Sequence, residues 1–553
     1  MSSLDPISGP LGRSNAKHLL KRATFGPTQQ EINSFAQLTV VEAVDMLFQP
    51  QAEPQPPVDP ATGENWVSPL PGPENSEESV LARYFIAWHL ELMRNEQTNV
   101  REKIVWFLHA HLPVSVFKVE WSAPIYYQNK LYRHFAFGSF KNLFKKLLLD
   151  NAMLWYLDNT LNEAENPNEN FAREMLELYT IGKGPQIGPG DYTHYTEEDV
   201  KAAAKVLTGL KVDITLENYD PDLLPETKIA QGYVYTYGED LAILHDPGIK
   251  TFSEKFQHTQ IQPNEIVSGF ATKNAVLDEL DQLIEMIFAQ EETARFLVRK
   301  LYRFFVFYNI TEEIEQDIIQ PLAQTFISSN FSIKAVLEQL FKSQHFYDAD
   351  NSQTSDDHKG AIIQSPVDLM NGAFRFFNIP FPTDVGRLYE ELYSQQLLNF
   401  YYIMGIPIYF PEDVAGYPAY FQAPGYNRNW ITSTNQACRY YLIYALLFGI
   451  KNENDEILIQ LDIIDWVEKS ENISDPSDPE ILVIELIEGL LAANLPQERL
   501  EYFTNIALMD NLPLYYWTVE WNNYQNGSSD DLVRNALHRL LISLMQSPES
   551  QLF

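Results

Sequence analysis

The chain has 553 residues, with 75 acidic and 39 basic side chains and a formal net charge of −36. This charge repels phosphate backbones and anionic lipid, which argues against nucleic acid and membrane surfaces as partners. Hydrophobic residues make up 45% of the chain, enough to bury a sizeable core.

Cysteine content and the chain start give two further expectations. Cys438 is the single cysteine, which excludes an intramolecular disulfide and a cysteine-rich zinc site. No apolar run approaches the ~20 residues that a membrane span needs. The first twenty residues lack an apolar signal core, so we expect a cytoplasmic protein as written, or an exported one if a leader has been removed.

Helical periodicity dominates the chain. Apolar residues recur at three- and four-residue spacing in Ser79–Arg94, Val100–Leu112, Phe140–Leu157, Ala294–Val306, Ile333–Phe341, Glu480–Ala492 and Asp531–Met545. Thr196 stands before an acidic first turn and Gly209 follows thirteen residues later, which are the start and stop signals of another helix.

Three stretches that break this pattern are expected to be inserted loops: 49–75, 210–262 and 379–430. The second carries alternating runs typical of a small hairpin. We therefore predict a mainly α fold, with a large multi-helical body, long irregular loops and at most a small β-hairpin element. Residues 1–470 are expected to form the helical core, and 471–553 a C-terminal helical segment packed on it.

The stretch NPNENFAREMLELYTIG, Asn166 to Gly182, places polar groups on a mostly apolar helix. A helix that starts near Pro167 or Asn168 puts four of them on one stripe: Asn170, Arg173, Glu174 and Glu177. One interpretation is an amphipathic helix with an internal Arg173–Glu177 pair. An Arg four residues before a Glu stabilises a helix less than the reverse order does. Glu177 also lies near the negative end of the helix dipole, where a carboxylate is disfavoured. A functional site is therefore an equal alternative.

Two histidine motifs add candidate residues. His109 and His111 end an apolar helix before Pro113, where the rings could converge on a metal; on a continuous helix they would diverge by ~200°. In HDPGIKTF a turn at Asp246 presents His245 and Lys250 on either side. The usual hydrolase, P-loop, zincin and dinucleotide motifs are missing.

Several stretches together resemble the bacterial DUF1800 family, which is named for its unknown function. They occur in family order: HLLKRATFGPT, WFLHAHLPVS, NENFAREMLELYTIG, HDPGIKTF, KLYRFFV, SPVDLM, FPEDVAGY, NWITST and a terminal QSPES. The chain departs from the family pattern at Leu210, Ile406 and Tyr417. The resemblance implies no reaction, but it implies that the polar residues between His109 and Glu177 form one site.

Two hypotheses follow. The first is a metal-dependent enzyme, hydrolytic or oxidative, whose Zn, Fe or Mn ion is bound by His109, His111 and Glu177. Its acid–base groups are His245 and Glu174. Its anionic substrate is held by four side chains: Asn168, Asn170, Arg173 and Lys250. The second is a non-catalytic binding or assembly protein, in which the polar stripe is a structural network.

The two hypotheses predict particular partners and particular contacts between helices. The expected partner is an anionic small molecule or a protein. The histidine helix should meet the Asn168–Glu177 helix, with an imidazole within ~6 Å of Glu174 or Glu177. The aromatic segment 379–430 should pack on the helical body and form one wall of the main pocket.

Overall fold

The computed structural model describes residues 3–67, 77–96, 98–225, 227–238, 240–350, 357–469, 471–492 and 494–553. It is 55% helical with 8% in short antiparallel strand pairs, which confirms the predicted mainly α fold. None of the helices in these ranges combines the length and hydropathy that a membrane crossing requires.

The first half of the chain is mainly helical. Its helices are α1 Gly12–Ala23, α2 Gln29–Phe35, α3 Val40–Leu47, α4 Glu78–Asn95, α5 Arg101–His111, α6 Val116–Val119, α7 Ser122–Phe135, α8 Phe140–Leu147, α9 Asn151–Tyr156, η1 Asn159–Leu161, α10 Asn170–Glu174, η2 Met175–Tyr179, α11 Glu197–Val206, η3 Glu254–Phe256 and α12 Lys273–Phe288.

The second half is helical to its end. It contains α13 Glu291–Phe305, α14 Glu312–Ile314, η4 Glu315–Ile319, α15 Gln320–Ser328, α16 Ile333–Lys342, η5 His345–Tyr347, α17 Pro366–Phe376, η6 Arg387–Leu397, α18 Leu398–Ile403, α19 Pro418–Phe421, η7 Tyr426–Trp430, α20 Ser433–Phe448, α21 Ile463–Glu468, α22 Pro479–Leu490, α23 Gln497–Glu501, η8 Tyr502–Leu508, α24 Tyr515–Gln525, α25 Asp531–Met545 and η9 Pro548–Gln551.

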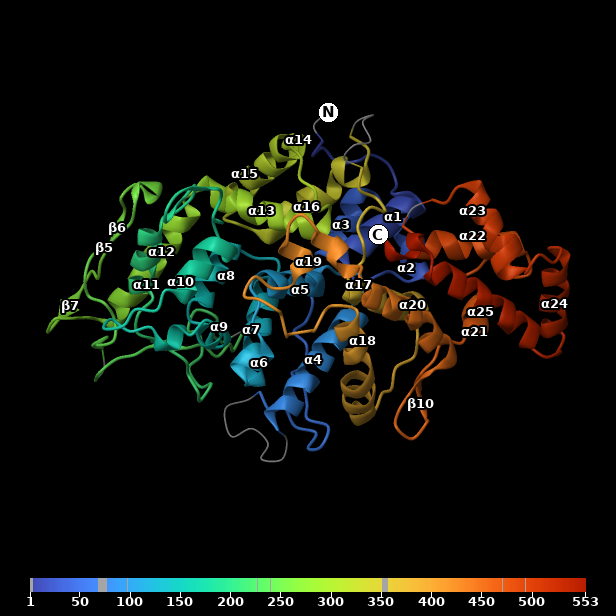
Figure 1. The fold of residues 1–553 in the computed structure, drawn as a ribbon, viewed down its shortest axis with the longest axis horizontal. Helices are drawn as coiled ribbons and strands as arrows, with labels where there is room; N and C mark the ends of the chain where they lie inside the picture. Colours follow the sequence, from blue (N-terminus) through green and yellow to red (C-terminus); the bar gives the residue numbers. More distant parts are fainter. Residues whose placement is uncertain are drawn as a thin grey trace.

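The molecule is elongated, with these helices in three regions (Figure 1). The teal and green elements α8–α12 form one end, and the red α22–α25 form the other. Between them lie α4, α5 and α17, covered on one side by α13–α16. α5 packs against both α4 and α7, and nearly every residue of α5 is buried, so the histidine-bearing helix lies in the core.

Strands occur only as short antiparallel pairs in the described ranges. The pairs are β1 Gln186–Gly188 with β2 Asp191–Tyr192, β3 Leu210–Lys211 with β4 Tyr233–Val234, β5 Lys250–Thr251 with β6 Gln260–Ile261, β7 Ile266–Val267 with β8 Phe270–Ala271, and β9 Ile450–Lys451 with β10 Ile457–Ile459. Only β3/β4 and β5/β6 fall within the predicted 210–262 stretch. The other pairs are closed by short turns, such as the one in which Gly269 takes a φ of +86°.

Two predicted helices differ from their sequence pattern. The stretch Phe140–Leu157 is interrupted by Asp150, whose side chain accepts a hydrogen bond from Met153 N and starts α9. The NENFARE helix begins at Asn170, not at Pro167 or Asn168, and it widens into the π-helix η2 after Glu174. This change of pitch alters which side chains share a face.

The predicted segment 379–430 is more ordered than a loop. It contains η6, α18, α19 and η7. Of its aromatic rings, Tyr401, Tyr409 and Tyr417 are almost completely buried. Tyr402 and Phe410 are exposed. The segment therefore packs on the body, as predicted. The proposed boundary near residue 470 stays a prediction.

Candidate functional site

The two asparagines of the stripe hold the start of α10. Asn168 Oδ1 accepts the backbone N–H of Asn170 at 2.9 Å, and Asn170 Nδ2 donates to Leu157 O at 3.2 Å. Asn168 N donates to Asn162 Oδ1 at 2.8 Å. These bonds satisfy groups that a helix start leaves without partners, and they tie α10 to the preceding turn. Their predicted role in substrate binding stays a prediction.

Arg173 pairs with carboxylates other than Glu177. Its guanidinium donates two hydrogen bonds to Glu197, at 2.8 and 2.7 Å, and one to Glu169 at 3.1 Å. Glu177 instead accepts from Lys183 Nζ at 3.1 Å and from the Tyr195 hydroxyl at 3.1 Å. The expected Arg173–Glu177 pair is therefore wrong, because the π-helical turn after Glu174 moves Glu177 away from Arg173.

Glu174 is the stripe residue with the most altered acidity. Burial raises its pKa to about 7, and the negative charges of Glu177 and Asp413 act in the same direction. A carboxyl group with a pKa near neutral can both give and accept a proton at physiological pH. This fits the predicted acid–base role, which the geometry does not test.

The two histidines of α5 diverge, since both lie within one continuous helix. The His109 ring packs against Tyr409 at a tilt of 34°, with centroids 4.0 Å apart, and its Nε2 lies 3.3 Å from the Tyr417 hydroxyl. His111 Nε2 lies 3.1 Å from Tyr179 O. Within the described ranges no group of three or more His, Cys, Asp or Glu side chains is arranged to hold a metal ion.

His111 nevertheless meets the predicted stripe. His111 and Glu177 line one cavity of about 180 Å³, which we call the His111 cavity. Its walls come from α5, η2, α13 and the segment around α19, and they include Phe107, Phe296 and Phe421. The histidine helix thus meets the segment that carries Glu177, through His111 and Tyr179. The predicted approach of an imidazole to within ~6 Å of a carboxylate stays a prediction.

His111 is neutral in this cavity. Burial, together with the positive charge of Lys300, lowers the pKa of His111 to about 3. Nε2 faces a backbone carbonyl and so carries the proton. Nδ1 is then a lone-pair acceptor, and it has no hydrogen-bond partner among the residues that the structure describes.

Lys300 is a cation that the sequence-based site omitted. It extends from α13 into the His111 cavity, where burial lowers its pKa to about 8 and nearby Arg303 adds to the shift. Its ammonium lies 5.2 Å from the centre of the Phe296 ring. No carboxylate of the described residues lies within ion-pair distance of it. The signal was available in KLYRFFV, where a lysine interrupts an apolar helix face.

His245 and Lys250 lie together, but apart from this cavity's lining. Lys250 Nζ lies 2.8 Å from both carboxylate oxygens of Glu279, and His245 Nε2 bonds to the same carboxylate. All three side chains have no exposed surface. Glu279 compensates the charge of Lys250. The Lys250 ammonium is therefore not free to bind an anion, as the sequence predicted it would.

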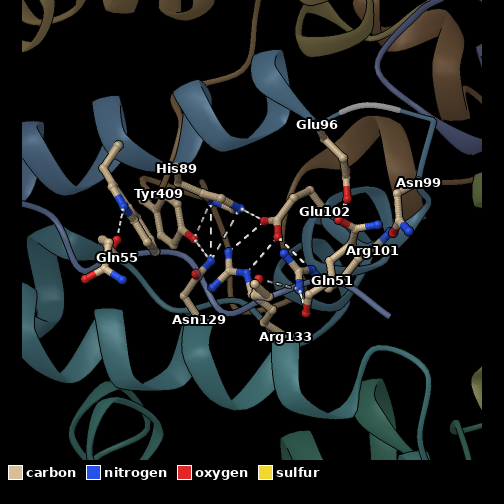
Figure 2. A network of polar contacts seen from close by, with 12 residues as sticks. Gln51, Gln55, His89, Glu96, Asn99, Arg101, Glu102, Asn129, Arg133 and Tyr409 are labelled. Atoms are coloured by element: carbon tan, nitrogen blue, oxygen red, sulfur yellow. Dashed lines mark hydrogen bonds and ion pairs between the residues drawn. The ribbon is translucent and has the colours of Figure 1, made fainter. Parts of the chain in front are cut away.

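A buried polar network positions the segment that closes the cavity. In Figure 2 Tyr409 reaches between α4 and α7, where its hydroxyl lies 2.9 Å from His89 Nδ1 and accepts from Asn129 Nδ2 at 2.9 Å. Glu102 beside it receives two hydrogen bonds of 2.6 Å from Arg133, which holds the pKa of that carboxyl well below its usual range although burial opposes this. The network fixes the stretch from Tyr409 towards Ala415 and Tyr420, which line the His111 cavity.

Comparison with protein families shows a match over most of the chain. Residues 18–552 match the family model described as "Protein of unknown function (DUF1800)". No curated protein and no solved structure matches the chain. The match covers nearly the whole chain, including every stretch from which the site is built. The chain therefore belongs to the DUF1800 family.

Proposed function

We propose that this protein binds a small anionic compound with an apolar body in the His111 cavity. The observation that carries the proposal is Lys300, a partly buried ammonium that faces the cavity without a carboxylate partner among the described residues. Leaving a charge in apolar surroundings is costly unless a counter-charge is supplied. A bound anion supplies that counter-charge, and the phenylalanine rings receive the apolar body.

The other polar groups of the cavity define the ligand further. His111 Nδ1 and the Glu177 carboxylate are both acceptors, so they favour a hydroxyl or amino group on the ligand. A cavity of about 180 Å³ is smaller than a typical drug-sized site, so the ligand is of the size of benzoate or a small hydroxy acid.

The enzymatic form of the proposal places proton transfer on Glu174. Its pKa of about 7 suits a group that exchanges protons at neutral pH. Glu174 immediately precedes the π-helix that carries Glu177 to the cavity, but it is not itself part of the cavity wall. A hydrolytic or an oxidative reaction is compatible with this role. A divalent metal, as predicted from sequence, would find two ligands in the cavity, His111 Nδ1 and Glu177.

Calorimetric titration with benzoate, and with neutral benzamide as the matched compound, tests the binding proposal. We expect benzoate to bind at pH 7 and benzamide to bind at least tenfold more weakly. Lys300→Met, which keeps the apolar stem, should remove the difference, and Lys300→Arg should keep it. Lys469→Met, at an exposed lysine paired with Asp465, is the charge-matched control. Equal binding to wild type and Lys300→Met would overturn the proposal.

The alternative is an assembly protein in which the polar stripe only fixes helix packing. The observation that favours it is the pair of hydrogen bonds from Arg173 to Glu197, which links α10 to α11. Neither side chain lines the His111 cavity. In that case neither benzoate nor a metal would bind, and Arg173→Met would lower the melting temperature and change nothing else.

A further inference from the structure

A second and larger concavity lies beside α4, away from the lining of the His111 cavity. It has a volume of about 650 Å³ and is lined by α4, α6, α18 and the residues just before Tyr409. We call it the Arg83 groove, after its one basic side chain. Its walls are mainly apolar and include Ile86, Val116, Leu398 and Ile408. Its volume lies in the range of small-molecule sites, and it shares no lining residue with the His111 cavity.

Arg83 is unusual for an arginine of so acidic a chain. It is half-buried, and it has neither an ion pair nor a hydrogen bond with any residue that the structure describes. By contrast, Arg387 on η6, which is also half-buried, pairs with Glu391 and Glu456. A guanidinium beside apolar walls with no counter-charge is a ready partner for a carboxylate.

The two acidic residues of the groove do not fill this role. Glu78 accepts hydrogen bonds from the backbone N–H and the hydroxyl of Ser122, at 3.0 and 2.9 Å, and is therefore engaged with the start of α7. Glu120 is exposed in a left-handed conformation after α6, with a φ of +55°. The Ser122 donors are neutral, so Glu78 keeps its charge, and the groove is lined by one cation, Arg83, and two carboxylates. This balance disfavours ligands with several anionic groups.

The edge of the groove offers exposed apolar surface. Phe117 is 79% exposed and Tyr402 67% exposed, and both line the groove. An apolar partner that covers large exposed aromatic side chains removes apolar surface from water, which favours binding. An alkyl or aryl chain extending from Arg83 along Ile86 and Leu398 would reach them.

We propose that the Arg83 groove binds an amphipathic monoanion, that is, a single carboxylate with a medium-length apolar tail. The carboxylate pairs with the Arg83 guanidinium and the tail lies along the apolar walls. The site is separate from the benzoate-sized cavity at Lys300 and does not depend on the function proposed for it.

Titration of the full chain with decanoate tests this site. Decanol and decyltrimethylammonium serve as a neutral and a cationic probe with the same alkyl chain length. We expect decanoate to bind at least tenfold more tightly than either. Arg83→Met should abolish that preference, Arg83→Lys should retain part of it, and Arg387→Met should leave it unchanged. Phe117→Ser, at an exposed ring that can be changed without loss of the core, should weaken the binding of all three probes, because it removes apolar surface without adding a charge.

Three outcomes would overturn the proposal. One is the same decanoate affinity in Arg83→Met as in wild type. Another is loss of decanoate binding in Lys300→Met with Arg83 intact, which would place the probe in the His111 cavity. The third is tighter binding of decyltrimethylammonium than of decanoate, which would show that Glu120 and Glu78 dominate the groove.

Discussion

The Lys250 ammonium lies 2.8 Å from both carboxylate oxygens of Glu279, and neither side chain has any exposed surface. Glu279 belongs to α12 and Lys250 to β5, so the pair joins the strand-bearing stretch to a long helix. His245 bonds to the same carboxylate. A cluster with three internal partners fixes packing, and this is the role that its geometry supports.

Removing one partner of this cluster should be costly. Glu279→Gln leaves the Lys250 charge buried without compensation, and we expect the free energy of unfolding to fall by about 3–5 kcal/mol. The double variant Glu279→Gln with Lys250→Met should recover most of this loss, because no charge then remains. Urea denaturation measures both. A double variant as unstable as the single one would contradict the argument.

Glu174 should make stability depend on pH. Its folded pKa of about 7 lies above the value of ~4.3 for an unfolded glutamate, so the folded state binds more protons between these limits. The stabilisation is present below the unfolded pKa and is lost as pH rises through 7. At pH 8 Glu174→Gln should therefore raise stability, by about 1–2 kcal/mol after allowance for its partial exposure.

The matched control for this variant is Glu198→Gln, at an exposed carboxylate on α11. It should leave the pH profile of the melting temperature unchanged. Asp150, whose pKa burial also raises to about 7, keeps a residual slope in both variants. A Glu174→Gln profile that parallels the wild-type profile from pH 5 to pH 8 would show that Glu174 titrates normally.

The sequence predicts helices better than it predicts partners. Asp531–Met545 was expected from its apolar period and is α25 with the same bounds, because a solvent-facing amphipathic helix needs only local information. The π-helical turn at η2 has no such local signal, and it is what separates Arg173 from Glu177. Lys300 matters because no carboxylate of the described residues lies within ion-pair distance of it. A sequence shows the lysine but not its distance from the carboxylates.

Glu177 should be tolerant of substitution. Its ion pair with Lys183 is partly exposed, since the lysine side chain is 38% exposed. Such pairs contribute about 0–1 kcal/mol, so Glu177→Gln should lower the melting temperature only slightly. Elemental analysis of wild type and variant measures metal content at the same time. If wild type holds a stoichiometric metal and the variant does not, Glu177 is a ligand. If both hold it equally, the predicted metal role of Glu177 is wrong.

Binding at Lys300 should weaken in alkaline solution. The ammonium, with a pKa of about 8, is present at pH 7 and largely lost at pH 9. Benzoate affinity in the His111 cavity should therefore fall across this range, although the bound anion itself shifts the midpoint upwards. Lys300→Arg, which stays charged, should bind benzoate equally at both pH values. A wild-type affinity that does not change between pH 7 and 9 would show that Lys300 is not the anion's partner.

Gly416 should control the fit of the segment that closes the His111 cavity. Its φ is +95°, and a Cβ added there would lie 2.5 Å from the carbonyl oxygen of Ala110 on α5. Gly416→Ala therefore adds both backbone strain and a clash with backbone that cannot move aside. Gly527 has a similar φ of +92° with nothing within 4 Å, so Gly527→Ala reports the strain alone. We expect Gly416→Ala to be less stable than Gly527→Ala by about 1–3 kcal/mol, the usual cost of overpacking. It should also weaken benzoate binding, because Ala415 and Tyr420 would be displaced from the cavity wall. Equal stability of the two variants in urea denaturation would mean that the segment does not press on α5 and that the cavity wall is set elsewhere.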